Sequence, residues 1–239
     1  MGGIDALLLK IKRGENPFFR WLRTLGYALF QANLPVPRAL RPALGFLYNL
    51  HFLIWLAFRT FKTFVYCEPL FRARCASAGK RLHVALLPRL VGRPSIRIGN
   101  DVKLHGRVTI IDAGGAGAEL IIGDGAQIGH LVTFVIARQV VIGAGAGIAS
   151  ECFITDTDSP VFDAAPAQLD AAPVQIGEQA WIGHGSSILK GVNIGAAAMV
   201  GVGSVVAGDV ADHSVAMGNP ARIVKRARPE PVSTTAVQA

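Results

Sequence analysis

Hydrophobic residues recur every six positions through the second half of the chain. Neither the 3.6-residue period of a helix nor the two-residue period of a plain strand produces this spacing. A six-residue period with small corner residues predicts short parallel strands, three to a triangular coil, whose aliphatic side chains point inward. Fifteen positions in five triplets share the phase: Ile98, Leu104, Ile110, Ile122, Ile128, Phe134, Ile142, Ile148, Ile154, Ile176, Ile182, Ile188, Ile194, Val200 and Val206.

The first third of the chain has a different pattern. Residues 43–58, "ALGFLYNLHFLIWLAF", form an apolar run that Asn49 and His51 interrupt. The run is shorter than the roughly 20 residues of a spanning helix and lies too deep in the chain for a signal peptide. Prolines at 35, 37 and 42 are expected to separate helices. We therefore predict a basic, apolar helical region over 1–95.

Charge is distributed very unevenly. Residues 1–97 hold 16 Lys and Arg against 3 Asp and Glu, a net +13, whereas residues 98–239 carry a net −5. Basic residues also flank the apolar run, as is usual at a lipid interface. We expect helices within 1–75 to lie on or dip into the cytoplasmic leaflet, whose lipids are anionic. The alternative is a helical cap that packs on the next domain or a neighbouring chain. Nucleic acid is not an expected partner, because the aromatic residues cluster with leucines.

Cysteine usage narrows the chemistry further. Cys67, Cys75 and Cys152 make an odd number and have no CxxC spacing. A disulfide framework and a metal site are therefore not expected, and a reducing compartment fits the chain.

Two segments carry a family resemblance. "APVQIGEQAWIGHGSSILKGVNIGAAAMVGVGSVVAGDV" (172–210) and "AMGNPARIV" (216–224) resemble the hexapeptide-repeat acyltransferases, over about 96–226. The resemblance implies a mainly β fold: a left-handed parallel β-helix over 96–215, followed by a short C-terminal helix and flexible tail over 216–239. It also implies a homotrimer with sites between subunits, which transfers an acyl group, most often acetyl, from coenzyme A.

The segment "ITDTDSP" (154–160) departs from that family. There a histidine follows the aspartate and serves as the general base, a role suited to imidazole. Aligning Asp156 on the family aspartate puts Ser159 or Pro160 at the histidine, and a family asparagine falls on Glu151. Another histidine, a carboxylate or a loss of catalysis are the three alternatives.

The repeat phase supplies replacement candidates. His130, Ser150 and His184 each follow a repeat isoleucine by two positions, so they are expected to stack in one column, with the two histidines about 10 Å apart. By resemblance His184 borders the pantetheine arm of coenzyme A, and His105 is a more remote candidate. Asp156 and Asp158 are the carboxylate candidates, which we prefer narrowly as the base, since burial can raise a carboxyl pKa. Their alternative role is turn capping.

The remaining site residues come from the resemblance alone. Trp181, Glu151 and Ser159 are expected at the acceptor pocket, although packing is the alternative for Trp181. Ala207 and Gly208 stand where the family often has Thr-Lys, so one usual cofactor contact is lost. The residues expected to bind the donor are Gly183, Gly185, Gly201, Val202, Gly203, Ser204, Arg222 and Lys225 or Arg226; for the cations, a solvated tail is the alternative.

The sequence thus predicts an O-acyltransferase that uses acetyl-coenzyme A or another acyl-coenzyme A. Its acceptor is expected to be a sugar of a lipid-linked glycan or polysaccharide precursor. The expected location is cytoplasmic, peripheral to the inner face of the plasma membrane. A non-catalytic trimeric scaffold for envelope glycan synthesis, which has lost the family histidine, is the alternative.

Overall fold

The computed structural model describes residues 9–10, 12–13, 16–31, 37–114, 117–158 and 170–226. The chain divides into two compact units, Met1–Leu56 and Ala57–Ala239.

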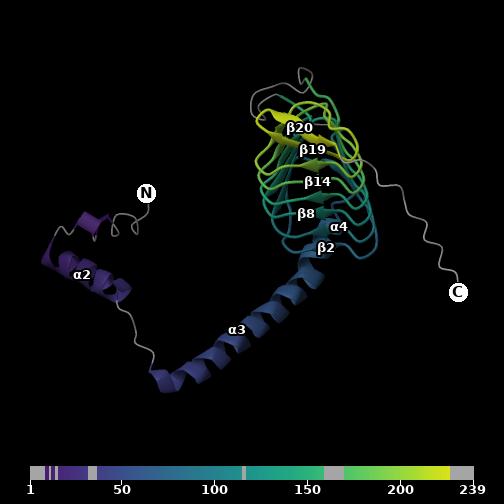
Figure 1. The fold of residues 1–239 in the computed structure, drawn as a ribbon. Coiled ribbons are helices and arrows are strands. Elements are labelled where there is room, and N and C mark those ends of the chain that lie inside the picture. Colours follow the sequence, from purple (N-terminus) through teal and green to yellow (C-terminus); the bar gives the residue numbers. More distant parts are fainter. Residues whose placement is uncertain are drawn as a thin grey trace. The chain divides into compact units, whose positions relative to one another are not determined.

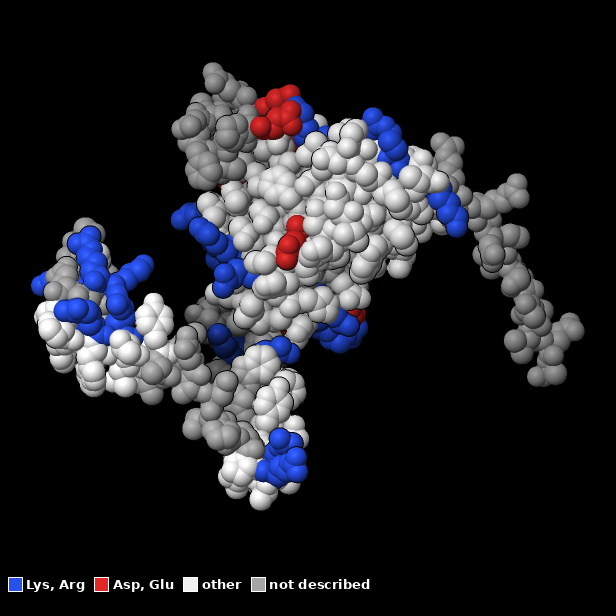
Figure 2. All heavy atoms as spheres, turned by 60° about the vertical axis from the view of Figure 1, so that its left-hand side comes forward, with Lys and Arg blue, Asp and Glu red and all other residues white. Residues whose placement is uncertain are grey.

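Among the described residues up to Arg72, the named elements are all helical. They are α2 (Pro17–Gln31), the 3-10 helix η1 (Arg38–Leu40), α3 (Arg41–Lys62), the π-helical turn η2 (Thr63–Cys67) and α4 (Glu68–Arg72). Pro37 precedes η1, whereas Pro42 lies in the first turn of α3, where a missing N–H costs little. No residue of α3 is buried, and Lys and Arg gather on the helices in Figure 2.

The second unit is a β-solenoid of about six turns, in which successive strands join three different sheets (Figure 1). The first sheet stacks β1 (Ser77–Ala78), β4 (Ser95–Ile98), β7 (Glu119–Ile122), β10 (Gln139–Ile142), β13 (Val174–Ile176) and β16 (Asn193–Ile194). The second stacks β2 (His83–Val84), β5 (Lys103–Leu104), β8 (Gln127–Ile128), β11 (Gly147–Ile148), β14 (Trp181–Ile182), β17 (Met199–Val200), β19 (Ser214–Gly218) and β20 (Ala221–Arg226). The third stacks β3 (Arg89–Val91), β6 (Val108–Asp112), β9 (Val132–Ile136), β12 (Phe153–Thr155), β15 (Ser187–Ile188) and β18 (Val205–Val206).

The predicted inward ladder is confirmed. All fifteen repeat residues are buried, and they pair in register from coil to coil, as Ile148 does with Ile182 and Ile154 with Ile188. A second buried ladder runs two positions earlier and uses smaller residues such as Ala146 and Cys152. The two ladders fill the triangular interior with apolar side chains, and this burial stabilises the solenoid.

The solenoid begins at β1, upstream of residue 96. Ala78 pairs with Ile98, and Leu90 pairs with Ile110, so residues 77–91 form a coil of their own. The helical segment before it also contributes to the core, because Cys67 and Phe71 are buried in the same apolar cluster.

The C-terminal helix expected from residue 216 is wrong for residues 216–226. β19 and β20 form an antiparallel pair there, with Met217 opposite Arg222 and Gly218 opposite Ala221. Ala216 continues the inward ladder above Val200, which commits the chain to an extended strand rather than a helix. The residues after 226 lie outside the described part of the chain.

Candidate functional site

Many corners of the solenoid have a left-handed residue three positions after the repeat residue. On the corner between the second and third sheets, here called the second corner, Glu151 has φ 62° and Gly185 has φ 66°. Glycine adopts this conformation freely, whereas glutamate is uncommon in it. The same conformation recurs at Arg81, Leu131 and Gln179, so it belongs to the corner geometry of the solenoid.

The second corner brings together two residues that the sequence offered for different roles. His184 Nε2 lies 3.7 Å from Glu151 Oε2, and the two side chains are 51% and 57% exposed. This distance is longer than a hydrogen bond but within reach of electrostatic attraction. The corner therefore presents an accessible imidazole with a carboxylate beside it.

The predicted column is present at this corner, but its members differ in setting. The backbone N–H of His130 donates to Ser150 Oγ at 3.2 Å, and His130 Nδ1 accepts from the Arg107 N–H at 3.1 Å. His130 thus caps the turn of the preceding coil, as a solvated turn residue would. His105, also on this corner, is exposed and faces Gln127 Oε1 across 3.2 Å.

Trp181 points outward from β14 and is 50% exposed. A Cβ on Gly147, in the coil below, would come within 2.5 Å of the indole, so the ring rests on that glycine. The indole is therefore fixed by packing and still presents an apolar surface beside the second corner.

The glycines of the second corner allow other atoms to approach the backbone closely, whereas the N–H groups of Gly201 and Gly203 are already hydrogen-bonded within the solenoid. A Cβ on Gly183 would lie 2.7 Å from the Val200 oxygen, and Gly185 has open space around it. The Gly203 N–H donates to the His184 oxygen at 2.8 Å, and the Gly201 N–H donates to the Ala216 oxygen at 2.8 Å. Ser204 is fully buried and its hydroxyl accepts from the Gly218 N–H, so it supports the hairpin; Val202 is exposed beside it.

The first half of "ITDTDSP" is buried inside the corner between the third and first sheets, here called the third corner. Asp156 is 0% exposed, and its carboxylate accepts from the N–H groups of Ala137 (2.6 Å), Arg138 (2.7 Å) and Gln139 (2.7 Å). Thr155 Oγ1 donates to the Thr157 oxygen at 2.9 Å. These contacts match turn capping, the alternative role considered for Asp156, and leave its oxygens no exposed surface.

Asp158 is exposed and belongs to an ion-pair cluster at the same corner. Its Oδ2 lies 2.6 Å from Lys190 Nζ, and Lys190 also pairs with Asp170. The hydrogen bonds to Asp158 and Asp170 raise the pKa of Lys190. Ser159 lies outside the described residues. Sequence reasoning missed Lys190, although its place two positions after Ile188 matches that of Asp156 after Ile154.

Within one chain, the two sets of catalytic candidates lie at opposite edges of the third sheet. Strand β12 begins just after Glu151 and ends just before Asp156. Five residues of extended strand cover about 16 Å. The structure therefore separates the Asp156 and Asp158 pair from His184 and groups Glu151 with the histidine instead.

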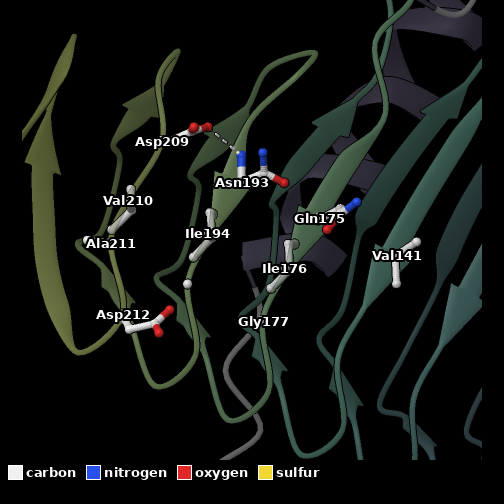
Figure 3. Close-up of a pocket in the computed structure, with 11 residues that line it drawn as sticks. Val141, Gln175, Ile176, Gly177, Asn193, Ile194, Asp209, Val210, Ala211 and Asp212 are labelled. Carbon is white, nitrogen blue, oxygen red and sulfur yellow. Dashed lines mark hydrogen bonds between the residues drawn. The ribbon is translucent and has the colours of Figure 1, made fainter.

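Basic candidates and cavities lie near the last coils. Arg222 and Lys225 are exposed on β20, and Arg222 lines a cavity of about 410 Å³ with Ala207 and Gly208. A second cavity of about 560 Å³ lies against the first sheet, where the Asn193 N–H donates to Asp209 (Figure 3). In the described ranges, no group of three or more His, Cys, Asp or Glu side chains is arranged to hold a metal ion.

Part of the chain is similar in sequence to known proteins. No family model matches the sequence. A segment of 121 residues is 36% identical to a candidate acetyltransferase of Saccharomyces cerevisiae, YJL218W, and covers 50% of this chain and 62% of that protein. Another of 127 residues is 32% identical to WbbJ of Escherichia coli K12, a candidate lipopolysaccharide-biosynthesis O-acetyltransferase, and covers 48% and 64%. The chain thus spans a little under two thirds of each relative.

A solved structure shares the fold. It is a mutant of AntD, an N-acyltransferase from Bacillus cereus, in complex with dTDP-4-amino-4,6-dideoxyglucose and coenzyme A. The TM-score is 0.56 at 20% identity, over 67% of this chain and 89% of that one. The chain is therefore a β-solenoid built on a six-residue repeat, and about half of it is similar in sequence to candidate acetyltransferases.

Proposed function

We propose that the chain is an acyl-coenzyme A-dependent O-acetyltransferase that modifies a sugar of a lipid-linked glycan or polysaccharide precursor. The observation that carries the proposal is the second corner, where an exposed imidazole, its carboxylate and an exposed indole surround glycines of close approach. Both curated relatives are candidate acetyltransferases, and the AntD structure holds coenzyme A and a nucleotide sugar.

The donor fits the same corner. Gly185 and Gly203 present open backbone, along which a narrow pantetheine arm can lie, and their neighbour Val202 offers apolar contact. Arg222 and Lys225 on β20 carry charges suited to the nucleotide phosphates. We also propose that the solenoid is left-handed and that three copies form a homotrimer, as the family resemblance implies. The second corner of one copy would then face a neighbouring copy.

His184 is the general base in this mechanism, in place of the Asp156 and Asp158 loop. In this proposal Glu151 Oε2 closes from 3.7 Å onto His184 Nε2 when substrate binds, which keeps the proton on Nε2 and leaves Nδ1 to accept. Nδ1 takes the proton of the acceptor hydroxyl as the oxygen attacks the thioester carbonyl. The departing sulfur then receives that proton from the imidazolium, which Glu151 stabilises until the transfer is complete.

Asp156 has a positioning role, because its carboxylate holds the backbone of residues 137–139. Lys190 joins Asp158 and Asp170, and so ties together two described residues that are far apart in the sequence. Neither group needs to touch the reacting atoms.

The test is transfer of labelled acetyl from acetyl-coenzyme A to a membrane glycolipid extract. His184→Asn is expected to lower turnover by about 10²–10⁴-fold. His213→Asn is the matched control, since His213 is another exposed corner histidine, with φ 53°. If His184→Asn keeps wild-type turnover, the base lies elsewhere. If the wild type neither binds coenzyme A nor transfers acetyl, the non-catalytic scaffold is the better account.

We also propose that the protein works at the cytoplasmic surface of the plasma membrane. By length and composition, one helical segment, Arg38–Arg72, is long and apolar enough to cross a membrane. Within this segment, α3 begins at Arg41 and ends at Lys62, and both basic residues suit lipid headgroups. Flotation of the full chain with vesicles tests this association, and a chain that stays free of anionic vesicles at low salt refutes it.

A further inference from the structure

Charge within the solenoid unit is segregated along its axis. Residues 57–118, which lead into and form the first coils, hold 11 Lys and Arg against 3 Asp and Glu, a net +8. Residues 119–226, which form the later coils, hold 5 against 10, a net −5. The two ends of one rigid scaffold therefore differ in sign, and the field of the unit points along the coil axis.

Positive residues lie on all three corners and on two of the three sheet faces of the first two coils. Arg89 projects outward from the third sheet and Lys103 from the second, while Lys80, Arg93 and Arg107 are exposed on the three corners. We call these five residues the basic collar. Because the collar encircles the axis but occupies a short length of it, it suits a surface lying across the end of the solenoid. A partner bound to one face would need charges on that face only.

Aromatic side chains project from the helical segment that enters this end. Phe58, Phe61, Phe64 and Tyr66 are each more than half exposed, whereas Cys67 and Phe71 directly after them pack into the core. Exposed aromatic residues bordered by basic ones are typical of a lipid–water interface.

We infer that the first-coil end of the solenoid docks on an anionic lipid surface, with the coil axis pointing away from it. The collar meets the headgroups, and the aromatic residues of 58–66 enter the interface. Charge complementarity selects the lipid, since anionic headgroups attract Lys and Arg while the acidic far end is repelled.

This orientation sets the height of the second corner. The ladder from β2 to β14 rises by four strand spacings, which is about 19 Å. If the proposed acetyl transfer takes place at His184, the acceptor hydroxyl must stand off the headgroups by a similar distance. The acceptor class is then a lipid-linked oligosaccharide modified on an outer sugar, rather than a lipid whose first sugar adjoins the phosphate.

The docking test uses the full chain and no acyl donor. One triple variant removes collar charges, Arg89→Gln, Lys103→Gln and Arg107→Gln. Its matched control removes three charges from later coils, Arg138→Gln, Arg222→Gln and Lys225→Gln. Each charge removed beside an anionic surface weakens binding by about fivefold. Co-sedimentation with phosphatidylglycerol vesicles should therefore fall at least twentyfold for the collar variant and less than threefold for the control, with unchanged melting temperatures in both.

Hydrogen exchange supplies the orientation. Phosphatidylglycerol vesicles should slow exchange in peptides covering 79–107 but not in peptides covering 190–213, and phosphatidylcholine vesicles should slow neither. Equal binding by the two triple variants, or slowing at 190–213, overturns the inference even if the protein is an active acetyltransferase. Conversely, if the chain docks in this way but transfers acetyl to no glycan, the docking inference is supported and the proposed function is refuted.

The acceptor class is tested separately with active enzyme. A lipid-linked oligosaccharide should be acetylated at least tenfold faster on these vesicles than a lipid-linked monosaccharide, and the collar variant should lose that advantage. A soluble glycan without lipid should be acetylated equally by both enzymes. Preference for the monosaccharide would contradict the assigned height.

Discussion

The first two coils and the later coils share one interior and differ in the net charge of their outward side chains. Val84 and Leu104 in the early coils, and Ile182 and Val200 in the later ones, are all buried in the same cluster. Outside, the early coils carry basic side chains, whereas the later ones carry Trp181, Glu151 and His184. The inward positions thus specify the solenoid, and the outward positions are available for binding and catalysis at little cost to the fold.

The largest expected effect comes from truncating an inward and an outward side chain of the same strand and comparing the losses of stability. Ile154 faces inward on β12 and Phe153 faces outward. Ile154→Ala should lower the free energy of unfolding by about 2–5 kcal/mol, because it leaves a cavity in a packed interior. Phe153→Ala should lower the free energy of unfolding by less than about 1 kcal/mol. Denaturant unfolding measures both variants. Similar losses for the two variants would mean that inner and outer positions are not distinct.

A corner carboxylate should matter in proportion to its burial. Asp156→Asn removes charge-assisted bonds to three amides and places an N–H₂ group among donors, so we expect a loss of about 1.5–3 kcal/mol in unfolding free energy. Asp124→Asn changes an exposed cap on the Asn100 N–H, and should cost less than about 1 kcal/mol. The same variants decide the assignment of Asp156: an acetyl-transfer defect of a hundredfold in folded Asp156→Asn would restore it as a catalytic candidate.

A variant of Glu151 tests whether its charge assists His184 at the second corner. Glu151→Gln keeps the shape but removes the charge beside His184, so turnover should fall about tenfold with little change in the Michaelis constant for acetyl-coenzyme A. Phe153→Ala, two positions away, serves as the control. A rise in the acceptor Michaelis constant with unchanged turnover would instead support the substrate-binding role that the sequence suggested for Glu151.

The smallest effect is expected at Lys190. Its pKa is raised by Asp158 and Asp170, so its stabilising pairs are fully present below the ordinary lysine pKa and are lost as pH rises through the raised value. The melting temperature of Lys190→Met should therefore fall slightly below that of wild type near neutral pH. The difference should vanish at strongly alkaline pH, and Lys225→Met should show no such trend. A difference that grows with alkalinity would contradict the assignment.

The sequence was most informative where the period was unbroken. Fifteen inward positions followed from spacing alone, but the first coil escaped because Ala78 and the half-buried Leu90 are weak markers of the phase. The hairpin at 214–226 was missed because the family resemblance suggested a helix. The repeat phase was sufficient to predict that Glu151 and His184 are close. Glu151 follows Ile148 by three positions, His184 follows Ile182 by two, and the two isoleucines pair.

Asp156 could not be assigned from spacing. Its burial depends on three backbone amides 17 to 19 residues earlier, and those become neighbours only when one coil stacks on another. A sequence shows a carboxylate in a loop, whereas the folded corner shows a carboxylate whose oxygens are already occupied. The charge segregation was visible in the sequence, but the collar required knowing where each sheet begins.

Donor binding at the second corner is tested by the hydrogen-exchange footprint of acetyl-coenzyme A on the full chain. We expect slower exchange in peptides covering 181–187 and 199–206, at the second corner, and no change in peptides covering 79–107. A footprint on the first coils, or no footprint at saturating acetyl-coenzyme A, would contradict the assignment of donor binding to the outward positions of the later coils.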